Sequence, residues 1–559
     1  MPRIRARLVM VGTSVVFSAC GGSPRVVVAP AAAPVSAALR EQTADQQVWH
    51  VLSRLTFGAR PGDAERVRTM GVDRWIDEQL RPAGISEART DQFLSTFETQ
   101  RASAAELQAK YPRPNQVLQQ LGARGDRSKL TPEESERLRQ AGEGFRRISG
   151  EMLSARVARG LLAERQLQEV MTDFWLNHFS VYIQKGGPEP YLIAEYENSV
   201  IRPNVLGKFR ALLGAVAHSP AMLYYLDNWE SSVDSTRARL APIPNAGRMT
   251  RAPQQQRRGG LNENYGRELL ELHTLGVDGG YTQQDVIGAA RAFTGWTLRG
   301  PRQGNGGSQF VPFMHDAGEK TFLGHRLAAG RGEQDGEDVL DIVARHPSTA
   351  RFIAFKLARR LVSDQPPAEL VDRAAETFRS TDGDLREVVR TIVTSPEFFS
   401  HAAYRSKVKS PFEVVVSALR ALGAEPDATP RTAAVIGTLG QPIYGHQAPN
   451  GWPETGTEWM NTGAILGRIN FGLAVAASRV PGATATGWPG ADQLRDASLE
   501  EQVDGVIGAL LGGAVSTETR AVLMTGENPL LKSAGQLPVL TGLPLIVGLA
   551  IGSPEFQRR

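Results

Sequence analysis

The stretch from Asn262 to Gly276 holds several residues that could do acid–base or metal chemistry. With about 100° between successive residues of a helix, Arg267, Glu268 and Glu271 fall on one side. Glu263 and Glu271 each stand four residues from Arg267, a spacing that allows ion pairs. The stretch predicts either a carboxylate-rich face that binds a metal or holds a proton donor, or a face of ion pairs against a neighbouring element or water. Its final glycine is expected to end the helix in a left-handed conformation.

His178 stands among aromatic residues in the sequence Phe174-Trp-Leu-Asn-His-Phe179. This setting indicates a partly buried imidazole, and such a group more often makes a hydrogen bond in a core than it ligates a metal. The histidine is nevertheless a catalytic candidate together with Glu268 and Glu271.

His315 and Asp316 follow a glycine-rich stretch and precede Gly318 and Lys320. An imidazole beside a carboxylate could orient a base or ligate a cation, with the lysine close to both. Alternatively, Asp316 could accept a hydrogen bond from its own backbone in a turn, since adjacent side chains do not have to converge. Both interpretations stay open at this point, and both residues are catalytic candidates.

His446 and Trp452 lie in a loop with glycine and proline, Tyr444-Gly-His-Gln-Ala-Pro-Asn-Gly-Trp-Pro-Glu454. The loop could present an aromatic surface to a ligand, and an exposed tryptophan beside a carboxylate suits stacking on a sugar. The tryptophan could equally cover the core. We take both residues as candidate ligand-binding residues.

Several catalytic chemistries are excluded because their motifs are absent from the sequence. It has no Gly-x-Ser-x-Gly elbow, no phosphate-binding Gly-Lys-Ser/Thr loop, and no Glu-x-x-His or His-Glu-x-x-His metal motif. Thiol catalysis and cysteine-ligated metals are excluded as well, since the single cysteine, Cys20, has another predicted use. An enzyme would have to use carboxylates, histidines or a bound cation, and the sequence identifies neither a metal nor a cofactor.

The N-terminus predicts export and a lipid anchor. Residues 1–19 combine a basic start, a short apolar run and small residues before Cys20. The run is too short for a membrane-spanning helix, which needs about 20 apolar residues. Phe17-Ser-Ala-Cys20 resembles the bacterial lipobox, whose cysteine is acylated, although phenylalanine replaces the usual leucine. We therefore expect a lipid on Cys20 that holds the chain at a bacterial membrane, at the outer membrane or the periplasmic face; the alternative is an ordinary signal peptide with an incidental cysteine.

The chain beyond this signal is nearly neutral. Loss of residues 1–19 removes three arginines and lowers the formal net charge from +4 to +1. Nucleic-acid binding depends on many contacts from Lys and Arg to phosphates, so we expect no nucleic-acid partner.

The rest of the sequence indicates a tether followed by a helical body. Residues 20–47 contain the lipidated cysteine and a tether rich in Pro and Ala. Residues 48–559 predict a mainly α fold, a large multi-helix orthogonal bundle with long surface loops near 231–260 and 299–309. The residues expected to cap helices are Thr282, Ser348, Ser410 and Ser498.

Several motifs follow one another in an order typical of one bacterial family. They are His50-Val-Leu-Ser-Arg-Leu-Thr-Phe-Gly-Ala-Arg-Pro-Gly62, Phe174–Phe179, Asn262–Gly276, Ala292-Phe-Thr-Gly-Trp296, His315–Lys320 and Gly451-Trp-Pro-Glu454. Together they resemble the domain of unknown function 1800 family, from about residue 48 to the C-terminus. The resemblance implies a secreted, mostly helical protein, often encoded beside a second uncharacterised family that is sulfatase-like. It implies no activity.

Two hypotheses of different classes follow. The first is a lipid-tethered envelope protein that acts as a binding or assembly factor with a secreted, sulfatase-like partner. The second is a metal-assisted or acid–base hydrolase of an envelope or extracellular polymer, which requires Glu268, Glu271, His178 and His315 to converge in one pocket.

Overall fold

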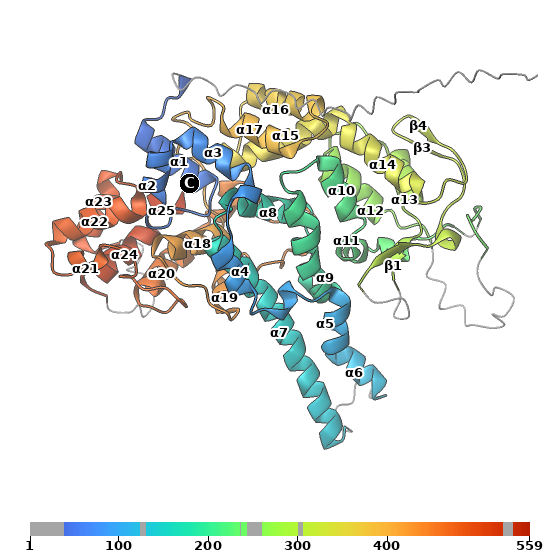
Figure 1. Ribbon diagram of the computed structural model, residues 1–559, viewed down its shortest axis with the longest axis horizontal. Helices are drawn as coiled ribbons and strands as arrows, with labels where there is room; N and C mark the ends of the chain where they lie inside the picture. Colours follow the sequence, from blue (N-terminus) through green and yellow to red (C-terminus); the bar gives the residue numbers. More distant parts are fainter. Residues whose placement is uncertain (1–38, 123–129, 235, 243–259, 300–305, 529–539) are drawn as a thin grey trace, which may run out of the picture. The chain divides into compact units, whose positions relative to one another are not determined.

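The computed structural model of the chain (Figure 1) describes residues 39–122, 130–234, 236–242, 260–299, 306–528 and 540–559. The predicted signal 1–19, Cys20 and most of the predicted tether 20–47 lie outside the described residues, as do parts of the two predicted surface loops. No helix of the described part is both long enough and apolar enough to cross a membrane.

Helices dominate the described residues, and the predicted mainly α fold is confirmed. The first group is α1 (Ala44–Arg54), α2 (Asp63–Met70), α3 (Val72–Gln79), α4 (Ala88–Leu94), α5 (Ala104–Lys110), α6 (Pro114–Gln120), α7 (Pro132–Leu162), α8 (Gln166–His178), α9 (Glu189–Glu195), α10 (Phe209–Ala217) and α11 (Pro220–Tyr225). Next come α12 (Asn264–Glu268), α13 (Gln283–Ala292), α14 (Gln334–Arg345), α15 (Pro347–Leu361), α16 (Ala368–Ser380) and α17 (Leu385–Val393). The last group is α18 (Pro411–Ala421), α19 (Arg431–Thr438), α20 (Thr462–Ala476), α21 (Ala491–Leu494), α22 (Leu499–Leu511), α23 (Thr517–Thr525), α24 (Gly542–Gly552) and α25 (Pro554–Gln557).

Two short antiparallel hairpins interrupt the helices. Strand β1 (Trp296–Leu298) pairs with β2 (Ser308–Phe310), and β3 (Lys320–Phe322) pairs with β4 (His325–Leu327). The loop expected near 299–309 therefore ends in a strand. Within the loop expected near 231–260, residues 231–233 are buried, and the N–H of Val233 donates to the Met314 carbonyl at 2.7 Å.

Three of the four predicted helix caps are confirmed. Thr282, Ser410 and Ser498 each form a capping box with the acidic residue three positions later. The prediction for Ser348 is wrong: α15 begins at Pro347, and His346 caps it by accepting the Ser348 N–H on Nδ1 at 3.2 Å. A proline at the first helical position moves the cap one residue upstream of it.

The helix predicted from Asn262 to Gly276 changes its pitch part-way. After α12 it continues as a π-helix over Leu269–Thr274, so side chains beyond Glu268 no longer follow the spacing of an α-helix. Of the two ion pairs expected for Arg267, the pair with Glu263 forms at 3.4 Å, and among the described residues none joins it to Glu271. Gly276 follows with φ +83°, as predicted for the helix end.

Two hydrophobic clusters make up most of the core. The first uses residues between Val48 and Ala403, and the second is built chiefly from α18 to α25. In the second, α20 and α24 approach closely, since a Cβ at Gly472 would lie 2.4 Å from the Gly548 carbonyl oxygen. Helices α7 and α8 contribute side chains to both clusters and so lie between them.

Candidate functional site

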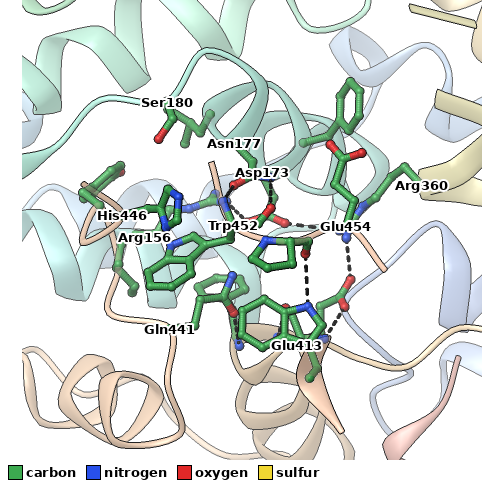
Figure 2. A pocket seen from close by; sticks show the side chains of 18 of the residues that line it. Arg156, Asp173, Asn177, Ser180, Arg360, Glu413, Gln441, His446, Trp452 and Glu454 are labelled. Carbon is green, nitrogen blue, oxygen red and sulfur yellow. Dashed lines mark hydrogen bonds and ion pairs between the residues drawn. The ribbon is translucent and has the colours of Figure 1, made fainter. Parts of the chain in front are cut away.

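A polar pocket opens where α7 and α8 meet the start of α18 and the segment 441–459 (Figure 2). Its cavity volume is ≈ 100 Å³. The wall combines side chains from both halves of the sequence, and both charged groups and aromatic rings line it. A concave site that combines fixed polar groups with aromatic rings is a candidate small-ligand site, and this one is smaller than the roughly 300–1,000 Å³ of drug-sized pockets.

Five charged side chains along the wall form an alternating ion-pair chain: Arg156, Asp173, Arg360, Glu413 and Arg559. Arg156 and Arg360 approach the carboxylate of Asp173 at 2.8 and 3.2 Å. Arg360 and Arg559 then approach Oε1 of Glu413 at 2.9 and 3.2 Å. This ion-pair chain joins elements that are distant in sequence, because its members come from α7, α8, α15, α18 and the C-terminal residue.

Glu413 connects this chain to the start of a helix. Its Oε2 accepts the Ser410 N–H at 2.8 Å in the capping box of α18, while Oε1 faces the two arginines. Burial would raise the pKa of Glu413, but Arg360, Arg559 and the Ser410 N–H overcome that effect and lower the pKa to about 2. The carboxylate is therefore a fixed anion at neutral pH.

Lys407 is buried, lines the same pocket and pairs with Asp364. Burial, together with the positive charge of Arg559, lowers the pKa of Lys407 to about 8, and Asp364 offsets part of that effect. The charge of Lys407 therefore changes closer to neutral pH than that of an ordinary lysine.

Among the aromatic residues of the pocket, Trp452 is held in place by Asn177 at the end of α8. Its side-chain Oδ1 accepts the Trp452 N–H at 2.7 Å, and its Nδ2 donates to the Trp452 carbonyl at 2.9 Å. Gly451 permits this approach: it has φ +72°, and a Cβ there would lie 2.3 Å from the Asn177 carbonyl oxygen. The indole position therefore depends on hydrogen bonds to the peptide groups on both sides of Trp452.

Two further rings extend the surface around Trp452. The rings of His446 and Trp452 have centroids 4.7 Å apart, and those of Trp452 and Trp459 lie 6.1 Å apart. Nε2 of His446 lies 2.9 Å from Oδ1 of Asn450, while the Trp459 indole N–H donates to the Pro453 carbonyl at 3.1 Å. The predicted ligand-binding candidates His446 and Trp452 are thus brought together in one pocket wall; their role stays a prediction.

The predicted catalytic candidates do not line this pocket. Glu268 is half-buried, and burial together with the nearby Glu271 raises its pKa to about 7. His178 is buried on α8, where its Nε2 donates to the His273 carbonyl at 3.0 Å, and burial lowers its pKa. Among the described residues, no hydrogen bond or ion pair joins Glu268, Glu271, His178 and His315 to one another.

His315 and Asp316 belong to a separate, fully buried network. Nδ1 of His315 lies 2.8 Å from the Thr294 carbonyl oxygen, and Nε2 lies 3.2 Å from the carboxylate of Asp335. The ammonium of Lys320 donates to the same carboxylate at 2.6 Å and to the Asp316 carbonyl at 2.6 Å. These side chains are at most 1% exposed.

For His315 and Asp316, the structure shows part of the geometry that each of the two interpretations expects. Asp316 accepts the Gly318 N–H at 2.8 Å, which is the predicted turn, and also binds Arg291 at 2.7 Å. The imidazole meets a carboxylate, but that of Asp335 and not that of its neighbour. Over the residues that the structure describes, no group of three or more His, Cys, Asp or Glu side chains is placed to hold a metal ion.

Comparison with known protein families shows the family to which the chain belongs. The sequence profile of the family described as "Protein of unknown function (DUF1800)" matches residues 50–558. The chain belongs to this family. No curated protein and no solved structure matches this chain. The resemblance found in the motifs is confirmed.

In this DUF1800 protein, sequence reasoning missed most of the pocket wall. Asn177 stood beside His178 in a motif that had drawn attention to the histidine, but neighbours on a helix point about 100° apart. With His178 in the core, Asn177 faces the loop. The members of the ion-pair chain had no local signal, since each pairs with residues far away in sequence.

Proposed function

We propose that this protein is exported, is held at a bacterial membrane by a lipid on Cys20, and acts in the cell envelope as a binding factor with a secreted partner. The N-terminal sequence supports this location, because a basic start, a short apolar run and a lipobox-like cysteine occur in that order. The nearly neutral body, which gives no electrostatic case for nucleic acid, agrees with it.

The ligand class that fits the pocket is a hydroxyl-rich molecule such as the end of an envelope glycan. One observation carries this proposal: Trp452 is fixed by both Asn177 hydrogen bonds beside His446, in a pocket that ion-paired side chains also line. An aromatic face can cover the apolar face of a sugar ring, while fixed polar groups meet its hydroxyls. A cavity of ≈ 100 Å³ limits the buried part of the ligand to a small group.

Binding is favoured over catalysis in this pocket because its three carboxylates are engaged in ion pairs: Asp173 and Glu413 pair with arginines, and Glu454 pairs with Lys356 at 3.0 Å. A general acid for glycoside hydrolysis needs a carboxyl group whose pKa is raised toward neutrality. The pKa of Glu413 lies instead near 2, and Asp173 is held between Arg156 and Arg360.

The proposal is tested by titrating the mature protein with a panel of hexose and N-acetylhexosamine oligosaccharides. Binding is measured by tryptophan fluorescence and by calorimetry. Trp452→Ala and Asn177→Ala are expected to weaken binding by about tenfold or more. Trp229→Ala is the matched control, since Trp229 is also half-buried but lies outside the pocket. Absence of binding to any member of the panel, or equal loss in the control, would contradict the proposal.

The hydrolase remains a second candidate because of Glu268, whose pKa of about 7 suits a proton donor at neutral pH. If it acts, the protein will release reducing ends from the same oligosaccharides, and Glu268→Gln will abolish this release. Arg495→Gln changes an exposed arginine that pairs with Asp492 and does not act on the pKa of Glu268, so it serves as the control. Undetectable release by the wild-type protein would remove this candidate.

A further inference from the structure

A second cavity lies beside the segment 407–409, which pairs with residues 557–559. Lys407 lines the first pocket and Lys409 lines this one, while Arg559 lines both. The volume of the cavity is ≈ 70 Å³. That volume is several times the roughly 10–15 Å³ that one water needs, and it is small for an organic cofactor.

Positive charge predominates in the wall of this cavity. Arg405, Lys409, Arg558 and Arg559 line it, and Glu555 is the one acidic side chain among the lining residues that the structure describes. The carboxylate of Glu555 accepts the Ser516 N–H at 2.9 Å and the Thr519 hydroxyl at 2.8 Å. The carboxylate is therefore engaged at the start of α23.

The arginine side chains that line the cavity differ in how many ion pairs and hydrogen bonds they form. Arg559 contacts Glu413, and the guanidinium of Arg405 donates to the Ala514 and Leu511 carbonyl oxygens. Arg558 is exposed and, among the described residues, its side chain forms no ion pair or hydrogen bond. The wall can therefore offer Arg558 to a ligand without breaking an existing pair.

Lys409 is the central group of the cavity. Its side chain is buried, its Nζ donates to the Ser417 hydroxyl at 3.0 Å, and it lies 4.1 Å from the centroid of the Phe556 ring. Over the described part of the chain, no carboxylate comes within ion-pair distance of this ammonium. A buried cation without a counter-charge is costly, and a bound anion removes that cost.

We infer that this cavity binds a small oxyanion of the phosphate or sulfate type, with Lys409, Arg405 and Arg558 as its cationic ligands. Charge-assisted hydrogen bonds from ammonium and guanidinium groups are the usual contacts of such anions. Burial, followed by Arg559, Arg405 and Arg468, lowers the pKa of Lys409 to about 7, while Glu413 acts in the opposite direction. An anion close to Nζ favours the protonated amine, so binding is expected to weaken as pH rises from 7 to 9.

Calorimetry with inorganic phosphate and with sulfate, at constant ionic strength and pH 7, tests the inference on the mature protein. One anion is expected to bind per chain, and chloride at the same ionic strength is expected to give no heat. Lys409→Met should abolish binding. Arg558→Gln replaces an exposed side chain, should keep the fold, and should weaken binding several-fold.

Arg495→Gln is the matched control, since Arg495 is an exposed arginine paired with Asp492 outside the cavity. It should bind as the wild type does. The inference is overturned if neither anion binds the wild-type protein, or if Arg558→Gln and Arg495→Gln bind phosphate equally well. Should Lys409→Met fail to fold, the comparison of the two arginine variants decides the matter.

Discussion

Two polar clusters of this protein differ in their exposure: one is enclosed in the core and stabilises the fold, and the other lines a cavity that could hold a ligand. The network of His315, Lys320 and Asp335 is closed, with every side chain at most 1% exposed. The ion-pair chain from Arg156 to Arg559 instead borders a cavity, and its members come from four helices and the segment after α25. The closed network holds neighbouring strands and turns together; the open one surrounds space that a ligand can fill.

The comparison also shows where a sequence motif misleads. His315, Asp316 and Lys320 stand close in sequence and look like a reactive group. In the structure their polar atoms are directed at one another, at Thr294 and at Asp335. Oδ1 of Asp335 is the one oxygen of that carboxylate without a hydrogen-bond partner among the described residues, and it is buried. A buried cluster whose polar atoms mostly bind one another contributes to uniqueness of the fold and does not face a substrate.

The largest effect is expected from Asp335→Ala, which breaks the closed network. The variant leaves the ammonium of Lys320 buried without its counter-charge and Nε2 of His315 without its partner, a change that costs about 3–5 kcal/mol. Denaturant unfolding measures it. Asp338→Ala is the control on the same helix, because Asp338 forms a more exposed pair with Arg331 and its loss should cost under about 1 kcal/mol. Equal losses in the two variants would show that the network is not a structural centre.

The next largest effect is expected on the acid stability of the protein, through Glu413 in the ion-pair chain. The pKa of Glu413 falls on folding from its ordinary value of 4.5 to about 2, so the stability it contributes is present above pH 4.5 and is lost as pH falls toward 2. That window corresponds to about 3 kcal/mol. Glu413→Gln should lack this part of the acid loss when unfolding is measured against pH.

Glu425→Gln provides the comparison, since it removes an exposed carboxylate that pairs with Arg89. It should retain the wild-type acid profile. The same acid loss in Glu413→Gln as in the wild type would mean that the ion-pair chain does not hold the pocket wall as described.

A smaller effect is expected from Gly451→Ala. Both the positive φ of +72° and a Cβ 2.3 Å from the Asn177 carbonyl oxygen oppose the change, so the loop must move away from α8. Gly513→Ala has a similar φ of +81° with no atom within 4 Å of the new Cβ, and it isolates the backbone cost of about 1–2 kcal/mol. Gly451→Ala should lose at least about 1 kcal/mol more and should alter the Trp452 fluorescence. Identical unfolding curves would argue against the tight Asn177–Trp452 contact.

The sequence predicted those features that depend on local patterns. The mainly α fold and the caps at Thr282, Ser410 and Ser498 follow from short-range hydrogen bonds that a sequence displays directly. The loop motif around His446 and Trp452 was also visible, because glycine and proline mark such loops.

The remaining features depend on contacts between distant residues. The π-helical turn after Glu268 removed the expected Arg267–Glu271 pair, and no spacing rule for α-helices anticipates it. Asn177 meets Trp452 across 275 positions, and Arg360 meets Asp173 across 187. Such pairs are decided by packing of the two hydrophobic clusters, so one sequence alone could not reveal them.

The most direct test compares oligosaccharide affinity in Trp452→Ala and His315→Gln, measured by the same titration and supported by unfolding curves. Trp452→Ala is expected to stay folded and to bind about tenfold or more weakly, while His315→Gln is expected to lose stability and to keep its affinity in the folded fraction. Loss of affinity in a stable His315→Gln, with unchanged binding by Trp452→Ala, would contradict it.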